Sequence, residues 1–330
     1  MKQRPLGPFQ VSALGLGCMN LSHAYGAPPS RQDAVALLLR ALDLGVTLFD
    51  TAALYGFGLN ETLLGEVLSA HRSKFTLASK GGLHGNAEGK RVVDGRPETI
   101  KWSCEQSLKR LRTDVIDLYY LHRWDKRVPI EDSAGAMADL VREGKVRTIG
   151  LSEVSAATIQ RAHAVHPIAA VQTEYSLWTR NPEIAVLDAC REIGAAFVAF
   201  SPLARGFLTG TLRDVTGLGE RDIRKTMPRF SPETYAANLR LLDGYAAIAA
   251  SVGCTPSQLA LAWLLHKADH IIPIPGTRSI AHLEDDVAAD AVKLDSGVMQ
   301  QLDALINRHT VTGPRYDAMA QAGVDTEEFA

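Results

Sequence analysis

Four polar residues of this chain follow apolar runs, and together they could carry proton-transfer chemistry. The pair Asp50 and Tyr55 comes after the run VTLF, Lys80 after FTLAS, and His122 after IDLYYL. A tyrosine keeps its proton at neutral pH, because its unperturbed pKa is about 10. A lysine cation nearby would stabilise the tyrosinate, a carboxylate would keep that lysine charged, and a histidine could donate a hydrogen bond to a developing oxyanion. This set is suited to giving a proton to a carbonyl oxygen while another group delivers hydride.

The apolar runs have the pattern of buried strands that alternate with amphipathic helices, which indicates an α/β fold with parallel strands. The expected strands cover residues 13–17, 46–50, 75–79, 116–121, 146–150, 169–172, 195–200 and 271–274. The expected helices cover residues 31–44, 60–70, 97–112, 131–142, 155–165, 182–192, 256–267 and 280–290, and a hairpin over 2–12 precedes them all. Eight such pairs predict a (β/α)8 TIM barrel, formed by one domain over residues 1–330. Its C-terminal face would bring the four polar residues together.

Two segments are longer than the repeating unit requires. Residues 206–254 are expected to form extended loops at the C-terminal face of the barrel, with a helix from about 232 to 252. The tail after about residue 309 is expected either to be mobile or to fold across the mouth. The alternative fold is a doubly wound sheet, which would place a glycine-rich phosphate loop after the first strand. There the chain reads GLGCMN from Gly15, without the third glycine and with no helix before residue 31.

Composition argues against several classes of protein. The 330 residues are 46% hydrophobic and 22% charged with a net charge of −2, so a large core is possible and no basic stripe suits a nucleic acid. The N-terminus lacks an apolar targeting segment and no run approaches the ~20 apolar residues of a membrane span, which favours a cytoplasmic protein. The four cysteines form no Cys-x-x-Cys pair, so we expect buried thiols rather than disulfides. No metal is expected, because no second histidine or carboxylate with ligand spacing lies near the four polar residues.

The segments FDTAALYG, LASKGG and YYLHRWD resemble the motifs of the aldo-keto reductases, and the alternating pattern resembles that superfamily from residue 4 to about 300. Within the superfamily the chain is similar to a perakine-reductase-like branch. The resemblance implies the NADPH-dependent, reversible reduction of an aldehyde or ketone. It also implies that Tyr55 is the acid/base and that Asp50, Lys80 and His122 support it. The expected partner is a small-molecule carbonyl compound, with no nucleic acid and no membrane, and the oligomeric state is not indicated.

The resemblance further implies a cofactor site in the other half of the barrel. Ser152 and Gln172 correspond to residues that hydrogen-bond the nicotinamide carboxamide, and Phe200 corresponds to the aromatic residue that stacks on the nicotinamide ring. The turn expected to cradle the pyrophosphate contains Ser201, Pro202, Leu203, Arg205 and Gly206. The segment expected to bind the adenosine phosphate begins at PIPGTR and contains Gly276, Thr277, Arg278, His282, Asp285 and Asp286.

The chain departs from the family pattern at five of these positions. Glu153 stands where the family usually has an asparagine beside the carboxamide, and Phe200 replaces the commoner tyrosine. His282 occupies the place of a longer basic residue, and Asp285 and Asp286 replace a Glu-Asn pair around the adenine. These departures affect the expected strength of NADPH binding more than the reaction class.

Met19, Tyr25 and Trp124, with the loop 207–230, are expected to wall the carbonyl site and to favour an apolar, aromatic or polycyclic substrate. Trp124 could equally be a packing residue. Two other functions stay open: a cofactor-binding regulatory subunit of a membrane channel, and a non-redox (β/α)8 lyase or isomerase. Because all four catalytic positions are filled, the sequence favours an enzyme over a regulatory subunit, and the PIPGTR segment is not expected in a non-redox barrel.

Overall fold

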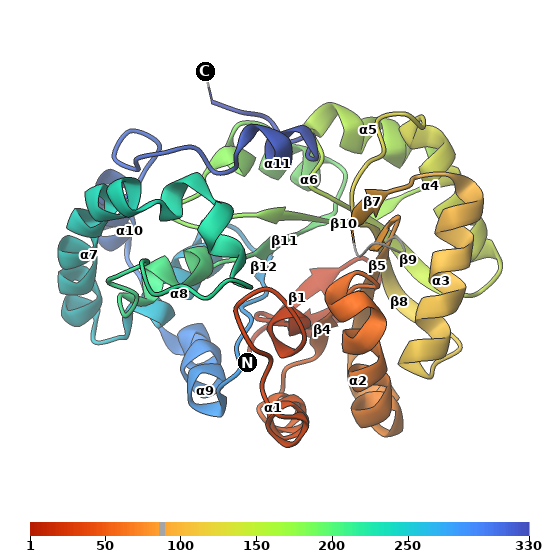
Figure 1. Cartoon of the computed structure of the whole chain (residues 1–330), viewed down its shortest axis with the longest axis horizontal. Helices are drawn as coiled ribbons and strands as arrows, with labels where there is room; N and C mark the ends of the chain where they lie inside the picture. Colours follow the sequence, from red (N-terminus) through yellow and green to blue (C-terminus); the bar gives the residue numbers. More distant parts are fainter. Residues whose placement is uncertain (86–89, 330) are drawn as a thin grey trace.

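The computed structural model describes residues 1–85 and 90–329. Eight parallel strands curl around one axis with helices outside them, as Figure 1 shows, and each strand pairs with the next one along the barrel. The strands are β3 (Leu16–Gly17), β4 (Leu48–Asp50), β5 (Thr76–Gly81), β8 (Ile116–Leu121), β9 (Val146–Ser152), β10 (Ile168–Glu174), β11 (Ala196–Phe200) and β12 (Ile271–Pro273). The predicted TIM barrel is confirmed.

Two glycines join the first strand of the barrel to the last. The amide of Gly15 donates to the carbonyl oxygen of Pro273 at 3.0 Å, and the amide of Gly17 donates to that of Pro275 at 3.0 Å. A Cβ atom on Gly17 would lie 2.8 Å from the carbonyl oxygen of Ile274, closer than two such atoms can approach. The glycines of the GLGCMN segment therefore allow strand closure and are not part of a phosphate loop.

Eight helices follow the strands, close to where the sequence predicts them. They are α1 (Arg31–Asp43), α2 (Leu59–Leu68), α3 (Pro97–Leu111), α4 (Ile130–Arg142), α5 (Ala156–Val165), α6 (Val186–Glu192), α8 (Pro256–Lys267) and α9 (Ile280–Ala288). Helix α8 begins with a capping box, in which the Thr255 side chain accepts from the Gln258 amide and the Gln258 side chain accepts from the Thr255 amide. This cap fixes the start of α8 next to the cavity described below.

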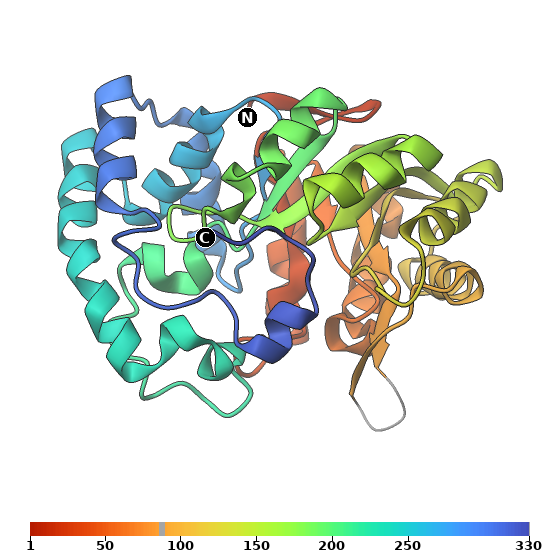
Figure 2. The same cartoon turned by 90° about the horizontal axis from the view of Figure 1, so that it is seen from above.

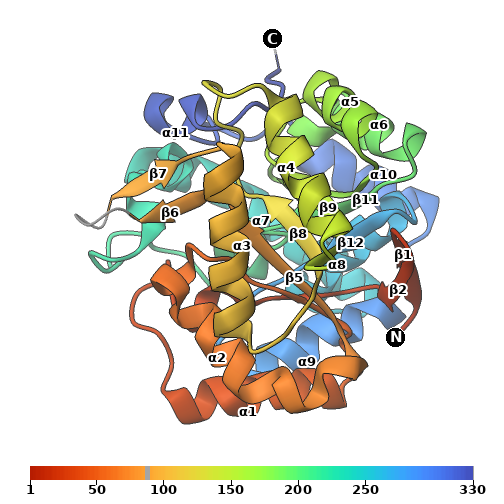
Figure 3. The same cartoon turned by 90° about the vertical axis from the view of Figure 1, so that its right-hand side faces the viewer.

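Two hairpins lie at opposite ends of the barrel, as Figures 2 and 3 both show. The predicted N-terminal hairpin, β1 (Gln3–Leu6) and β2 (Phe9–Ser12), covers the end at which the strands begin, where the fully buried Leu6 packs into the barrel interior. A second hairpin, β6 (Leu83–Gly85) and β7 (Arg91–Val93), follows β5 at the other end and was not predicted. It adds a wall to the end that carries the polar residues.

The long segment and the tail lie together over the barrel mouth. The predicted helix at 232–252 is confirmed as α7 (Pro232–Val252), whereas α10 (Ser296–Leu305) and α11 (Ala318–Ala322) were not predicted. Residues 310–329, which we call the C-terminal strap, run across the face opposite the N-terminal hairpin (Figure 2). Asn238 of α7 donates to the carbonyl oxygen of Thr312 at 2.9 Å, and Arg229 donates to that of Gly313 at 3.0 Å. The tail therefore folds across the mouth.

None of the described helices is by itself long and apolar enough to cross a membrane. Helices α7 and α8 meet the requirement only as a pair, with a bend of 79° between them. The side chains of α8 from Leu259 to Leu265 are buried in the core of the protein. The apolar character of this pair is thus explained by packing against the barrel.

Candidate active site

The structure brings the four polar residues together at the C-terminal face. Asp50 ends β4, Tyr55 begins a short 3-10 turn after it, and His122 follows β8; Lys80 lies inside β5, which is longer than predicted. The Lys80 ammonium donates to Asp50 Oδ1 at 2.5 Å, to the Thr51 carbonyl oxygen at 2.9 Å and to the Tyr55 hydroxyl at 3.2 Å. The rings of Tyr55 and His122 meet edge to face, with centroids 5.8 Å apart.

Lys80 and Asp50 form a buried ion pair behind the tyrosine. Burial alone would lower the pKa of Lys80, but the attraction of Asp50 and of Tyr55 outweighs burial and raises the pKa above its ordinary value. The second oxygen of Asp50 accepts from the Gln172 amide at 2.8 Å, so both carboxylate oxygens have a donor. Lys80 is therefore a fixed positive charge 3.2 Å from the tyrosine hydroxyl.

The pKa of Tyr55 is shifted in the opposite direction to the one expected from the sequence. Burial raises this pKa above 10, and Lys80 lowers it without overcoming the effect of burial. The charge of Asp50 adds to the increase, whereas the charge of Arg123 opposes it. Tyr55 is thus a protonated acid at neutral pH, and the lysine reduces the cost of releasing its proton.

His122 is neutral at pH 7 in this environment. Burial, followed by the charges of Arg123, Lys80 and Arg91, lowers the pKa of His122 well below its ordinary value of 6.5. Its Nδ1 atom is buried without a hydrogen-bond partner among the described residues. A neutral imidazole has one N–H donor, and such a group can orient a carbonyl oxygen without giving up a proton.

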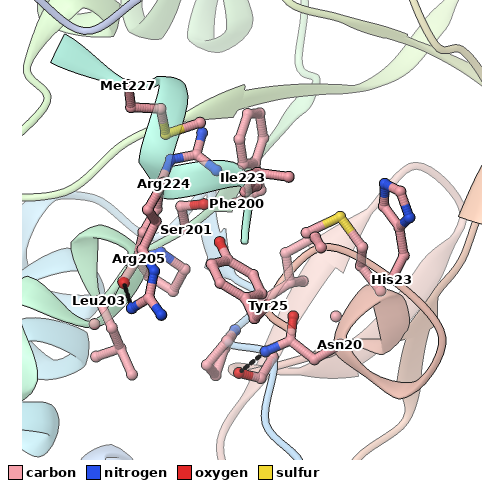
Figure 4. A pocket seen from close by; sticks show the side chains of 18 of the residues that line it. Asn20, His23, Tyr25, Phe200, Ser201, Leu203, Arg205, Ile223, Arg224 and Met227 are labelled. Atoms are coloured by element: carbon pink, nitrogen blue, oxygen red, sulfur yellow. Dashed lines mark hydrogen bonds between the residues drawn. The ribbon is translucent and has the colours of Figure 1, made fainter. Parts of the chain in front are cut away.

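One cavity of about 1260 Å³ connects Asp50, Tyr55 and His122 with the start of α9, and Lys80 lies buried behind its wall. Small-molecule sites usually measure about 300–1000 Å³, so this cavity is large enough for two ligands side by side. Figure 4 shows part of its wall, with Tyr25 facing Arg205 and Arg224. The sequence-predicted residues that line it, besides Asp50, Tyr55 and His122, are Met19, Tyr25, Ser152, Gln172, Phe200, Ser201, Pro202, Leu203, Arg205, Gly206, Gly276, Thr277, Arg278, His282, Asp285 and Asp286.

The end of the cavity at α9 combines a helix N-terminus with an arginine. Ser279 caps α9 by accepting from the His282 amide at 3.4 Å, and the Thr277 hydroxyl accepts from the Ser279 amide at 3.1 Å. Arg278 is exposed, and one of its nitrogens donates to the Ala27 carbonyl oxygen at 2.6 Å. Amides at a helix start beside a guanidinium favour an anion.

The two aspartates at this end repel a phosphate less strongly than two free, ionised carboxylates would. Asp285 accepts from the Thr255 hydroxyl at 2.9 Å and from the Gln258 amide at 2.8 Å, which ties it to the start of α8. Burial, with a smaller contribution from Asp285, raises the pKa of Asp286 to about 8. Asp286 is therefore mostly protonated, and uncharged, at neutral pH.

The turn between β11 and α7 is strained beside the cavity. Ser201, Ala204 and Arg205 have positive φ angles of 49°, 51° and 56°, which are unfavourable for residues other than glycine. Such conformations cluster at ligand-binding segments. Arg205, expected at the pyrophosphate, donates to Glu174 Oε2 at 2.6 Å, so its charge is already neutralised by a buried carboxylate.

Glu153, expected beside the nicotinamide, points away from the cavity. It is 1% exposed, and its Oε1 atom accepts from Arg315 of the C-terminal strap at 2.6 Å and from the Glu174 amide at 2.9 Å. Arg315 also donates to Glu174 Oε2 at 3.0 Å. The ion pair with the strap explains why a glutamate stands here, and the Glu153 side chain is not among the described residues that line the cavity.

Trp124, expected at the carbonyl site, lies outside the cavity lining formed by the described residues. Its indole nitrogen donates to the Val128 carbonyl oxygen at 2.9 Å, and the Arg161 guanidinium lies 5.7 Å from its ring centroid. These contacts hold the ring against the loop after β8 and α5. The alternative that Trp124 is a packing residue fits this placement.

Several residues that line the cavity were missed from the sequence. They include Asn20, His23, Arg91, Arg123, Tyr316 and Met319, whereas Arg224 lies in the loop 207–230 that was expected to wall the site. Arg123 could have been found, because it directly follows His122. The others lie in loops, in β7 or in the C-terminal strap, where no strand or helix period indicates which side chain faces inward.

No group of three or more His, Cys, Asp or Glu side chains in the described part of the chain could hold a metal ion. The four cysteines are free, and Cys18, Cys104 and Cys190 are buried. Burial raises the pKa of Cys190 to about 12 and so keeps its thiol protonated.

Comparison with known proteins identifies relatives over nearly the whole chain. Residues 13–307 match a sequence model of the aldo/keto reductase family. The chain is 42% identical over 309 residues to the probable aldo-keto reductase 1 of Glycine max, which covers 93% of this chain and 89% of that protein.

Solved structures share the fold. The glycerol dehydrogenase AKR11B4 from Gluconobacter oxydans superposes with a TM-score of 0.85 at 28% identity, over 96% of this chain and 99% of that chain. The aldo-keto reductase AKR11C1 from Bacillus halodurans, in its holo form, gives a TM-score of 0.78 at 30% identity, over 93% and 97%. An aldo/keto reductase from Klebsiella pneumoniae in complex with NADP and acetate gives 0.71 at 28% identity, over 99% and 100%.

Proposed function

This chain belongs to the aldo/keto reductase family, and we propose that it catalyses the reversible, NADPH-dependent reduction of an aldehyde or ketone to an alcohol. The observation that carries the proposal is the Lys80 ammonium, which lies 2.5 Å from Asp50 and 3.2 Å from the Tyr55 hydroxyl. Both of these partners line a cavity that continues to α9. The solved relatives in a holo form and in complex with NADP support a nicotinamide cofactor. The motifs further support a place in the perakine-reductase-like branch.

The residues of this chain account for the proton in the reaction. When bound, NADPH would supply the hydride that adds to the carbonyl carbon, and the cofactor would thereby become NADP⁺. Tyr55 donates its proton to the carbonyl oxygen, so that the C=O bond becomes CH–OH, and solvent then restores the tyrosine proton. Lys80 stabilises the transient tyrosinate, and the neutral His122 donates a hydrogen bond to the same oxygen and fixes its position.

The rest of the cavity suits the cofactor. We assign Ser152 and Gln172 to the nicotinamide carboxamide, because both line the cavity beside Asp50 and Tyr55. The Phe200 ring is assigned to the nicotinamide face, and the strained turn that follows it to the pyrophosphate. Arg278 and the amides at the start of α9 are assigned to the 2′-phosphate, which is the source of the expected preference for NADPH over NADH.

Replacement of Tyr55 by Phe tests the proposal. It removes the proton donor and keeps the ring, so we expect kcat to fall about 10²–10⁴-fold while the dissociation constant of NADPH stays nearly unchanged. Activity is measured by the loss of NADPH absorbance with a panel of aldehydes and ketones, and binding by fluorescence titration. A variant that turns over like the wild type would remove Tyr55 from this role. Wild-type protein that binds NADPH and reduces no carbonyl would instead favour a regulatory function.

A further inference from the structure

Two arginines at the catalytic end of the cavity have no carboxylate partner in the part of the chain that the structure describes. Arg123 follows His122 and Arg91 begins β7, and both line the cavity. Neither forms an ion pair with a carboxylate of residues 1–85 or 90–329. Among residues 1–85 and 90–329 the nearest carboxylates in sequence are already paired, since Asp94 binds Arg96 at 2.7 Å and Asp125 binds Arg127 at 2.8 Å.

Arg123 is held next to the reacting groups by neutral acceptors alone. One of its terminal nitrogens, Nη1, donates to the His122 carbonyl oxygen at 2.6 Å and to the Ser152 hydroxyl at 3.2 Å. Both bonds use Nη1, which leaves the other guanidinium nitrogens without a described partner. The side chain is half-buried, so an unpaired charge here keeps only part of its hydration.

Arg91 lies opposite His23, a neutral histidine that does not neutralise the charge of the guanidinium. Its Nη2 atom is 3.4 Å from His23 Nε2. Burial, followed by the charge of Arg91, lowers the pKa of His23, so this imidazole is neutral and can accept a hydrogen bond. Arg91 is exposed at the rim and keeps its full positive charge.

Both guanidinium groups lie close enough to the catalytic end for their charges to act there. After burial, the charge of Arg123 is the largest contribution that lowers the pKa of His122, and Arg91 also contributes. Arg123 acts on Tyr55 in the same direction. Coulomb interactions weaken with distance and are screened by water, so Arg123, which acts on both side chains, and Arg91, which acts on His122, lie near the place where a carbonyl meets them.

No acidic side chain among the described residues of the cavity lining forms an ion pair with either arginine. Asp50 is neutralised by Lys80 at 2.5 Å. Asp317 accepts from the Ala320 amide at 2.8 Å as the cap of α11. Asp285 and Asp286 lie at the α9 end, next to the start of α8. The catalytic end therefore has an excess of positive charge toward the ligand.

From this layout we infer that the substrate is an aldehyde or ketone that also carries a carboxylate, which binds Arg123 with support from Arg91. The planar guanidinium of arginine matches the geometry of a carboxylate and can bind both oxygens. The apolar side chains of Met19, Leu54 and Leu83 line the cavity as well and would contact the carbon skeleton. This changes the expectation of a wholly apolar substrate, and it rests on the proposed reductase function.

A matched pair of substrates tests the inference. Benzaldehyde and 4-carboxybenzaldehyde share the ring and the aldehyde and differ by the carboxylate. We expect the wild type to have the higher kcat/KM with 4-carboxybenzaldehyde, and Arg123→Met to reduce the ratio of the two kcat/KM values about tenfold to a hundredfold, mainly through KM. The matched control is Arg142→Met, which removes a charge from the exposed end of α4 and should leave the ratio as in the wild type.

The outcomes separate the inference from the reductase proposal. If Arg123→Met lowers kcat/KM for both aldehydes equally, Arg123 only positions neighbouring groups and the inference is overturned. If the wild type reduces neither aldehyde nor any other carbonyl, the reductase function itself fails. Calorimetric binding of 4-(hydroxymethyl)benzoate, which should weaken in Arg123→Met, gives a readout without turnover. Arg91→Met, in the exposed hairpin, provides a second variant with a smaller loss in the same ratio.

Discussion

Arg315 of the C-terminal strap should be one of the most important single residues for stability outside the barrel repeat. Its side chain is 3% exposed and binds two carboxylates, Glu153 at 2.6 Å and Glu174 at 3.0 Å. In Arg315→Met the side chain still fills the space, but among the described residues Glu153 loses its only ion-pair partner and Glu174 keeps only Arg205. Removing one partner of a buried ion pair typically costs about 3–5 kcal/mol.

The pKa of Glu174 gives a similar magnitude. Burial raises this pKa, but the attraction of Arg205 and Arg315 outweighs burial and lowers it from 4.5 to about 2. At 1.36 kcal/mol per unit, this difference corresponds to roughly 3 kcal/mol, shared between the two arginines. Because the pKa is depressed, the stabilisation is complete above about pH 4.5 and is lost as the pH falls toward 2.

Urea unfolding at pH 7 measures the effect. We expect Arg315→Met to lower the free energy of unfolding by about 3 kcal/mol, and its acid unfolding to begin at a higher pH than in the wild type. Adding Glu153→Gln should restore part of the loss, because the second change removes the unpaired charge. Arg308→Met, at an exposed arginine just before the strap, is the control and should stay within about 0.5 kcal/mol of the wild type. A loss below about 1 kcal/mol for Arg315→Met, or no recovery in the double variant, would refute the reasoning.

Three further predictions concern the cavity. If Asp50 acts through Lys80, the loss of kcat in the double variant Lys80→Met, Asp50→Asn should be far smaller than the product of the single losses, and fully multiplicative losses would show independent roles. Arg278→Ala should weaken NADPH binding about tenfold and NADH binding hardly at all, and equal losses in fluorescence titrations would mean that Arg278 does not read the 2′-phosphate. Because the pKa of Asp286 is about 8, NADPH affinity should fall as the pH rises from 7 to 9, by roughly fivefold for about 1 kcal/mol of repulsion, and Asp286→Asn should flatten this profile. An unchanged profile in Asp286→Asn would assign the pH dependence to another group.

The parts of the fold that the sequence predicts are those with a local signal. A buried parallel strand is a short apolar run and an outer helix has a period of 3.6 residues, so each strand–helix unit can be located from its own residues. The barrel then places Asp50, Lys80 and His122 on neighbouring strands, which is why their convergence follows from sequence alone. Hairpin β6–β7 is only three residues long on each side and follows directly from β5, so it has too few residues to show a period.

The pairing of Glu153 with Arg315 could not be predicted for a different reason. The two residues are 162 positions apart, and nothing in a tail with weak periodicity indicates where it returns to the barrel. From the sequence, Glu153 is therefore interpreted as an altered nicotinamide contact, because its neighbour Ser152 matches a family position. Its positive φ of 58° turns the side chain off the end of β9 toward the strap, which only the structure shows.

The long segment 206–254 and the C-terminal strap hold one another in place over the barrel mouth. Arg229, in the long segment before α7, donates to Gly313 of the strap at 3.0 Å, and Asn238 of α7 both donates to Thr312 and accepts from it. The strap in turn contributes Tyr316 to the cavity wall. Apart from one isolated β-bridge between Tyr25 and Asp222, the described residues of these segments form no strand pairing with the barrel, so the shape of the substrate end depends on these mutual contacts. Substitutions that change substrate preference should therefore be found in the strap, the long segment and hairpin β6–β7, and should leave the Tyr55 and Lys80 geometry intact.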